Sequence, residues 1–109
     1  MSDVEELFRQ HPSFGAGEAI AEKDVSSGRL GYRSHGKHVP WWPDIAKILQ
    51  ERYRITFDVV GHCITDMAVA AEAAGYNARM DAEFLSRFGG VDIIESVTRE
   101  VERKRKKRG

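Results

Sequence analysis

Apolar residues recur at helical spacing along most of the chain, and the pattern breaks only where glycine and proline are frequent. Near the N-terminus a capping box of Ser2 and Glu5 precedes an apolar stripe, which predicts a short helix that ends before Pro12. This stripe consists of Val4, Leu7 and Phe8. A second short helix is expected around residues 17–23.

The middle of the chain predicts a helix over residues 43–53, because proline suits a first helical turn and the apolar positions after Pro43 share one face. That face consists of Ile45, Ile48, Leu49 and Tyr53. The segment ITFDVV, residues 55–60, alternates in polarity and predicts a strand, although a helical turn capped by Thr56 fits it too. A short extended piece is also expected at residues 29–33.

The C-terminal half predicts two helices, over residues 62–74 and 78–88, with Gly75 as the stop between them. A last helix begins near Val91, after a pair of glycines, and runs into the basic C-terminus. The residues expected to face inward on these three helices are Ile64, Met67, Ala68, Ala71, Met80, Phe84, Leu85, Phe88, Ile94, Val97 and Val101.

The step between the helices at 62–74 and 78–88 also fits a helix-turn-helix unit, because Ala71 and Gly75 have the spacing common in such units. The second helix would then contact DNA. Its middle position, expected to be buried, is Asp81, and the carboxylates of Asp81 and Glu83 would repel phosphates. Two packed antiparallel helices are therefore the favoured interpretation.

These elements predict a mainly α fold, a single small domain of about five helices with at most one short strand or hairpin. We assign residues 1–102 to this domain and residues 103–109 to a basic C-terminal tail. The single cysteine of the 109 residues excludes an intramolecular disulfide and favours a reducing compartment. An acidic N-terminus without an apolar stretch and the absence of a long apolar run predict a soluble cytoplasmic protein without a transmembrane segment.

Charge is distributed unevenly although the chain is neutral overall. Residues 99–109 hold seven basic and two acidic residues, a net +5, so the remaining residues carry −5. An unbroken basic run forms the tail: Arg103, Lys104, Arg105, Lys106, Lys107 and Arg108. Such a run can bind the phosphates of nucleic acid, an acidic protein or an acidic membrane surface. A solvated terminus that aids solubility is the alternative.

Residues 25–43 form a long connection that contains basic but no acidic residues, and Arg33 and Lys37 are its candidate anion-binding residues. Gly31, Gly36 and Lys37 have the spacing of a phosphate-binding loop, G-x-x-x-x-G-K-[ST]. However, His38 stands where Ser or Thr should ligate magnesium, no apolar strand precedes Gly31, and a proline interrupts the expected helix. A basic loop is favoured over a nucleotide site.

Trp41 and Trp42 lie between two prolines at the start of the helix expected over residues 43–53. Aromatic residues at a helix entrance usually pack onto the core and the first helical turn. Alternatively, an exposed tryptophan beside basic residues stacks on a nucleobase or anchors a protein partner. Trp41 and Trp42 are thus candidate partner-binding residues.

A metal or thiol site is a further hypothesis, because imidazole, thiolate and carboxylate groups that suit zinc or iron occur in two short segments. The candidate ligands are His35, His38, His62, Cys63 and Asp66. Their spacing matches no tight zinc template, and the alternative is that they are ordinary loop and helix-start residues. Cys63 as a nucleophile is not favoured, and no catalytic residues are assigned.

A non-enzymatic binding or accessory protein is thus the function that the sequence favours over an enzyme, with no cofactor predicted. Its basic loop and tail would contact nucleic acid or another anionic partner. The first alternative is a protein–protein interaction module or homodimer that uses Trp41, Trp42 and the alanine-rich helix. The second alternative is the zinc or iron site.

Overall fold

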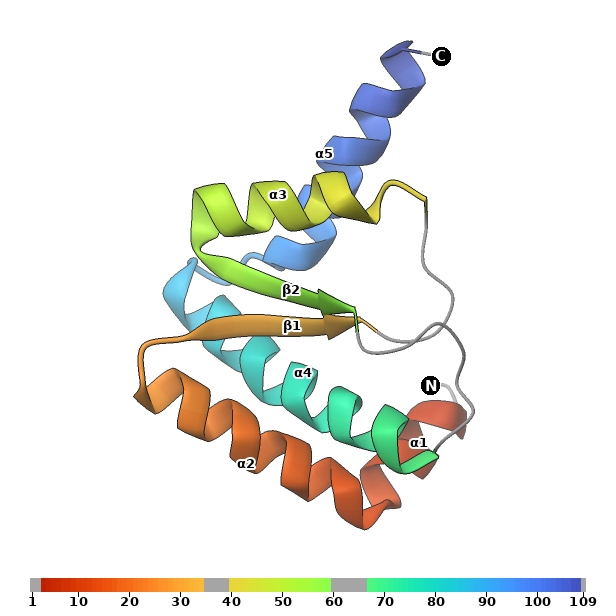
Figure 1. The fold of residues 1–109 in the computed structure, drawn as a ribbon, viewed down its shortest axis with the longest axis vertical. Coiled ribbons are helices and arrows are strands. Elements are labelled where there is room, and N and C mark those ends of the chain that lie inside the picture. Colours follow the sequence, from red (N-terminus) through yellow and green to blue (C-terminus); the bar gives the residue numbers. More distant parts are fainter. Residues whose placement is uncertain (1–2, 35–39, 60–66, 109) are drawn as a thin grey trace.

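The computed structural model describes residues 3–34, 40–59 and 67–108, which form five helices and two strands (Figure 1). The helices are α1 (Asp3–Gln10), α2 (Pro12–Ser26), α3 (Trp42–Tyr53), α4 (Met67–Arg87) and α5 (Ile93–Arg108). The strands are β1 (Leu30–Ser34) and β2 (Ile55–Val59). The predicted fold class, a mainly α single domain of about five helices with very little β structure, is confirmed.

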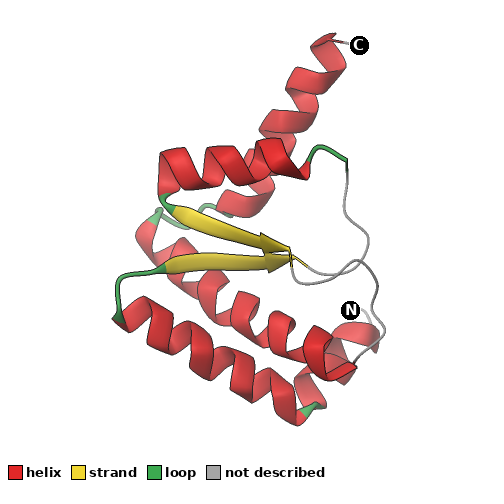
Figure 2. Cartoon of the chain, viewed as in Figure 1, coloured by secondary structure: helices red, strands yellow, loops and turns green. Residues whose placement is uncertain are grey.

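The two strands pair in parallel, with Leu30 opposite Ile55 and Ser34 opposite Val59. The extended pieces expected near these positions are therefore both present, and α3 connects them as a crossover helix. Parallel pairing follows from this connection, because the helix carries the chain back to the end at which β1 began. Figure 2 shows the small sheet between α3 and the α2–α4 pair.

The longest helix, α4, is continuous through Gly75, so the predicted stop at this glycine is wrong. A helix-turn-helix unit is excluded for the same reason. Gly75 is buried where α4 crosses α2, and a Cβ atom there would collide with the main-chain carbonyl of Phe14. Gly17 on α2 meets the carbonyl of Glu72 in the same way. These two glycines permit close helix packing rather than ending a helix.

The second helix is longer than the segment expected at 17–23, because Pro12 begins it rather than only ending α1. Proline fits the first helical position, where its missing N–H is not needed. The His11 side chain caps this end, since its Nδ1 accepts a hydrogen bond of 3.1 Å from the Ser13 backbone N–H. Packing against α4 compensates for the low helix propensity of the glycines in α2.

The main core lies between the sheet, α3, α4 and α5. Its largest fully buried side chains are Phe84, Leu49, Ile55, Met80 and Val97. A smaller cluster under α1 consists of Phe8, Ala70 and Ala71. Two residues predicted to face inward, Met67 and Leu85, instead lie on the surface and are 43% and 45% exposed, and Leu7 of the N-terminal apolar stripe is 53% exposed. Each lies at the edge of its apolar stripe, beyond the width that the neighbouring element covers.

The C-terminal helix α5 begins at a cap formed by Asp92, whose Oδ1 accepts a 3.1 Å hydrogen bond from the Glu95 backbone N–H. Ile93, Val97 and Val101 are buried at successive turns. Beyond Val101 the helix continues to Arg108 and extends away from the rest of the molecule (Figure 1). Within the described ranges, no helix has the length and apolar content needed to cross a lipid bilayer.

Candidate functional site

The basic residues at the C-terminus are presented on the projecting end of α5. Val101 is the last buried residue of this helix, and Arg103, Lys104, Arg105, Lys106 and Lys107 are all exposed. Among the described residues, no ion pair is formed by Arg103, Lys106 or Lys107. The end of α5 is therefore a dense array of cations, three of which have no ion-pair partner in the part of the chain that the structure describes.

The position of this array is fixed by Glu100, which joins α5 to α3. Its two carboxylate oxygens accept hydrogen bonds of 2.8 Å and 3.1 Å from the two terminal nitrogens of Arg52. Lys104 lies 3.3 Å from the same carboxylate, so its charge is partly compensated. The hydrogen bonds from Arg52, and then from Lys104, lower the pKa of Glu100 to about 2. Bidentate pairing of this kind fixes geometry as well as adding attraction.

Arg105 leaves this array and lies over the ring of Trp41, with its guanidinium carbon 4.5 Å from the ring centre. Trp41 is the residue immediately before α3, and its ring packs partly against the main core. Its indole N–H is buried and has no acceptor among the described residues. The contact thus joins a candidate partner-binding residue to a candidate anion-binding residue that lies far from it in the sequence.

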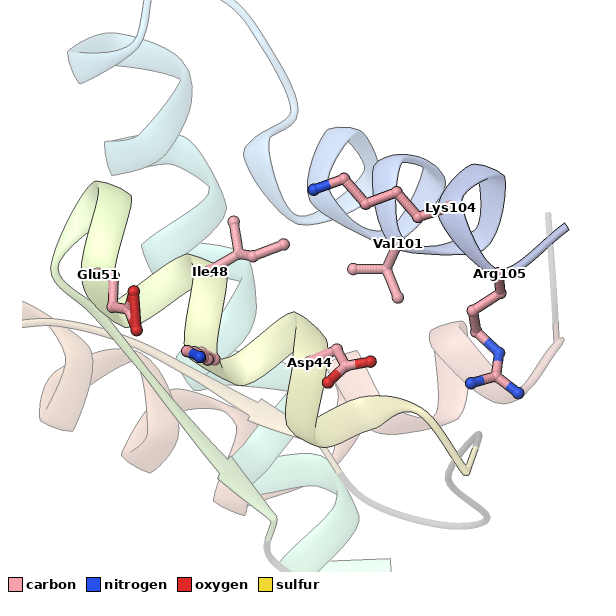
Figure 3. Close-up of a pocket in the computed structure, with 7 residues that line it drawn as sticks. Asp44, Ile48, Glu51, Val101, Lys104 and Arg105 are labelled. Carbon is pink, nitrogen blue, oxygen red and sulfur yellow. The ribbon is translucent and has the colours of Figure 1, made fainter. Parts of the chain in front are cut away.

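Two hollows of the surface meet at Arg105. One, of about 400 Å³, is lined by Trp41, Glu102, Arg105 and Lys106. The other, of about 260 Å³, lies between α3 and α5. Its lining residues are Asp44, Lys47, Ile48, Glu51, Val101, Lys104 and Arg105. In Figure 3 the side chain of Arg105 extends from α5 toward the start of α3, and Ile48 and Val101 point into the space between the helices.

Arg33, the other described candidate for anion binding, is engaged inside the protein. Its guanidinium donates a 3.1 Å hydrogen bond to Glu72 and lies 4.3 Å from the ring centre of Tyr76. The Asn77 side-chain amide pairs with both the backbone N–H and the backbone carbonyl of Arg33, at 2.7 Å and 2.6 Å. Arg33 therefore fastens β1 to α4 and lies apart from the basic end of α5.

Trp42 packs against the sheet, whereas Trp41 contacts α5. Its ring stacks on Phe57 of β2 at a centroid distance of 6.2 Å, and Phe57 stacks on Tyr32 of β1 at 6.0 Å. This aromatic row covers one face of the sheet. The alanines of α4 are also used internally, because Ala70, Ala71 and Ala73 are buried. Of the features considered for partner binding, Trp41 is the one that lies beside the cations of α5.

The candidate metal and thiol ligands lie outside the described residues: His35, His38, His62, Cys63 and Asp66. Lys37 lies outside them as well. The two segments that hold these residues follow Ser34 and Val59, which are partners at the same end of the parallel sheet. Across residues 3–34, 40–59 and 67–108, no group of three or more His, Cys, Asp or Glu side chains is placed to hold a metal ion. The zinc or iron hypothesis stays a prediction.

Arg52, Glu100 and Glu102 belong to this region although they were not among the residues predicted from the sequence. The spacing of Glu100 and Lys104 is the favourable i, i+4 order for a helical ion pair, so that contact was visible in the sequence. The contact between Arg52 and Glu100 joins helices far apart in the chain, and no local pattern indicates it.

Comparison with known proteins adds no functional information: no family model, no curated protein and no solved structure is significantly similar to this chain.

Proposed function

We propose that this protein binds nucleic acid through the basic end of α5 and has no enzymatic role. The observation that carries the proposal is the helical presentation of an unbroken basic run beyond the last core contact at Val101. Cations near the C-terminus of a helix also interact favourably with the helix dipole. That effect is confined to the last turn, whereas the basic run begins before it.

The geometry favours a duplex over a single strand. Successive residues of an α-helix are rotated by about 100°, so Arg103, Lys106 and Lys107 lie within an arc of about 100° on one side of α5, whereas Arg105 faces Trp41. The major groove of DNA admits an α-helix and is bordered by phosphates on both walls. A helix that lies in this groove can bring its cationic side against the phosphates of one wall.

A membrane surface suits this helix less well. Helices that lie in the lipid interface bury an apolar face among the acyl chains. The residues after Val101 are Glu102, six basic residues and glycine, so this part of α5 has no apolar face to bury. Its attraction to an acidic surface is electrostatic alone.

The acidic charge of the rest of the protein favours an approach in which the end of α5 meets the nucleic acid first. Residues 1–98 carry a net charge of −5, because the basic and acidic residues of the whole chain balance and residues 99–109 carry +5. A field of this polarity repels phosphates from the body of the protein and attracts them to the end of α5.

A salt-dependent binding experiment tests the proposal. Fluorescence anisotropy would measure binding of a labelled 20-base-pair duplex and of its single strand between about 50 and 200 mM salt. The test variant is R103Q/K106Q/K107Q, and the matched control is R9Q/K23Q/R29Q, which removes the same charge from exposed positions on α1, α2 and the turn that follows α2.

We expect a log–log salt slope of about −4 to −5 for the natural chain, as for five phosphate contacts. The test variant should lose about three of these contacts, so its slope should be correspondingly less negative. It should also lose most of the affinity. The control should stay within about twofold of the natural affinity, since it leaves the phosphate contacts in place. Equal losses in the two variants, or binding to anionic vesicles without duplex binding at low salt, would overturn the proposal.

A further inference from the structure

We propose that Arg105 and Trp41 form a stacking site for one unpaired nucleobase beside the duplex that the end of α5 binds. This inference rests on the proposed nucleic-acid binding and names the feature of the nucleic acid that the protein recognises. Bases are commonly stacked on aromatic rings or on the plane of an arginine guanidinium.

Arg105 is prepared for this contact because Trp41 already holds it. The indole ring packs against the main core on its inner side, and the guanidinium lies 4.5 Å from its centre. Arg105 remains exposed. A guanidinium fixed in this way loses little further freedom when a base stacks on it, so less of the interaction energy is lost to ordering.

The hollow beside Arg105 has the size and the polar groups that a nucleotide needs. Its volume of about 400 Å³ falls within the range of small-molecule sites, roughly 300–1,000 Å³. Lys106 borders it and can bind the phosphate of the same nucleotide. Glu102 borders it too, and a carboxylate accepts hydrogen bonds from the exocyclic amino groups of bases.

The carboxylate of Glu102 also indicates which bases fit. On the exposed Watson–Crick edge of an unpaired base, adenine and cytosine present an amino donor and guanine presents two donors, whereas the single N–H donor of thymine lies between two carbonyl oxygens. A Glu102 carboxylate that accepts a hydrogen bond from this N–H is repelled by the carbonyl oxygens on both sides of it. The site should therefore prefer an unpaired adenine, cytosine or guanine over an unpaired thymine.

The test compares a duplex that carries one bulged nucleotide with the same duplex fully paired. For the natural chain we expect about fivefold or greater preference for the bulged adenine or cytosine duplex, and a clearly smaller preference for bulged thymine. R105K keeps the charge but removes the planar guanidinium, so the ratio of the bulged-duplex affinity to the paired-duplex affinity should fall to about one. R103K is the matched control and should keep the preference.

Two further variants separate stacking from charge and from misfolding. W41L should lose the preference, and W41F, which keeps an aromatic ring under Arg105, should retain part of it. E102Q should reduce the discrimination between adenine and thymine. Thermal unfolding of each variant checks that the fold is intact.

The two proposals fail in different ways. Tail-dependent binding of the paired duplex with no preference for a bulge, or with a preference that R105K leaves unchanged, overturns the stacking site and leaves the proposed function standing. Absence of duplex binding at low salt overturns both.

Discussion

The backbone of Gly75 on α4 lies against the main-chain carbonyl of Phe14 on α2, closer than a side-chain atom at this position would permit. We expect Gly75→Ala to separate the two helices, because the obstructing atoms belong to the backbone and cannot rotate away. Overpacking of this kind typically costs 1–3 kcal/mol, and we predict a loss of about 3 kcal/mol in the free energy of unfolding. Urea unfolding followed by circular dichroism measures it.

Gly15→Ala provides the control for this prediction. Gly15 lies inside α2, but a Cβ atom there would meet nothing within 4 Å. Replacing an unobstructed helical glycine by alanine stabilises a helix by about 0.5–1 kcal/mol. The two substitutions should therefore have opposite signs, and similar effects would show that the α2–α4 contact does not depend on Gly75.

The same glycine shows where prediction from the sequence reaches its limit. The helical periodicity around it was correctly recognised, but a glycine that stops a helix and one that permits a close helix crossing have the same local pattern. The difference depends on Phe14, a partner far away in the chain. The parallel pairing of β1 and β2 was missed for a related reason, since five-residue strands do not indicate the direction of their neighbour.

For the candidate site, the sequence indicated the parts and not their assembly. The basic run and Trp41 were both identified, because charge density and aromatic residues are visible locally. The stacking of Arg105 on Trp41 depends on how α5 packs against α3, and the sequence could equally have placed Arg33 beside the tryptophan. Arg33 is instead bound to Glu72, which only the folded chain shows.

A second stability prediction concerns Arg54, which ends α3 in the left-handed conformation with φ of 58°. For a residue with a side chain this conformation costs about 1–2 kcal/mol, whereas glycine adopts it readily. We predict that Arg54→Gly raises the free energy of unfolding by about 1 kcal/mol. Arg54→Ala keeps the Cβ atom and should give no such gain, so an equal gain in both variants would attribute the effect to the lost charge instead.

The pH dependence of stability should reveal Asp81. Although Asp81 is exposed at the surface, partial loss of hydration around its carboxylate, and then repulsion by Asp92, raise its pKa to about 6. Because the unfolded chain loses this proton first, stability falls as the pH rises from about 4 to 6. Asp81→Asn should remove this decline. Since Asp81 keeps contact with solvent, we expect a gain of only about 1 kcal/mol at pH 7.

Asp92→Asn is the informative comparison for Asp81, because asparagine still caps a helix but no longer repels a carboxylate. It should shift the decline to lower pH without abolishing it. Melting temperatures of the natural chain and of both variants between pH 4 and 8 test this. A natural chain whose stability does not fall over this range would contradict the assignment.

The attachment of α5 to α3 gives the last prediction. The hydrogen bonds from Arg52 and Lys104 hold the pKa of Glu100 at about 2, below its ordinary value of 4.5. The stabilisation they provide is fully present above about pH 4.5 and is lost as the pH falls toward 2. Glu100→Gln should therefore lower the melting temperature at pH 7, and the difference from the natural chain should shrink as the pH approaches 3.

Glu95→Gln is the control, because Glu95 pairs with Arg99 of the same helix at an exposed position and should change little. Hydrogen exchange locates the effect: in Glu100→Gln, amides of residues 99–107 should exchange faster than in the control. Unchanged exchange there would mean that the apolar contacts of Val97 and Val101 hold α5 in place alone.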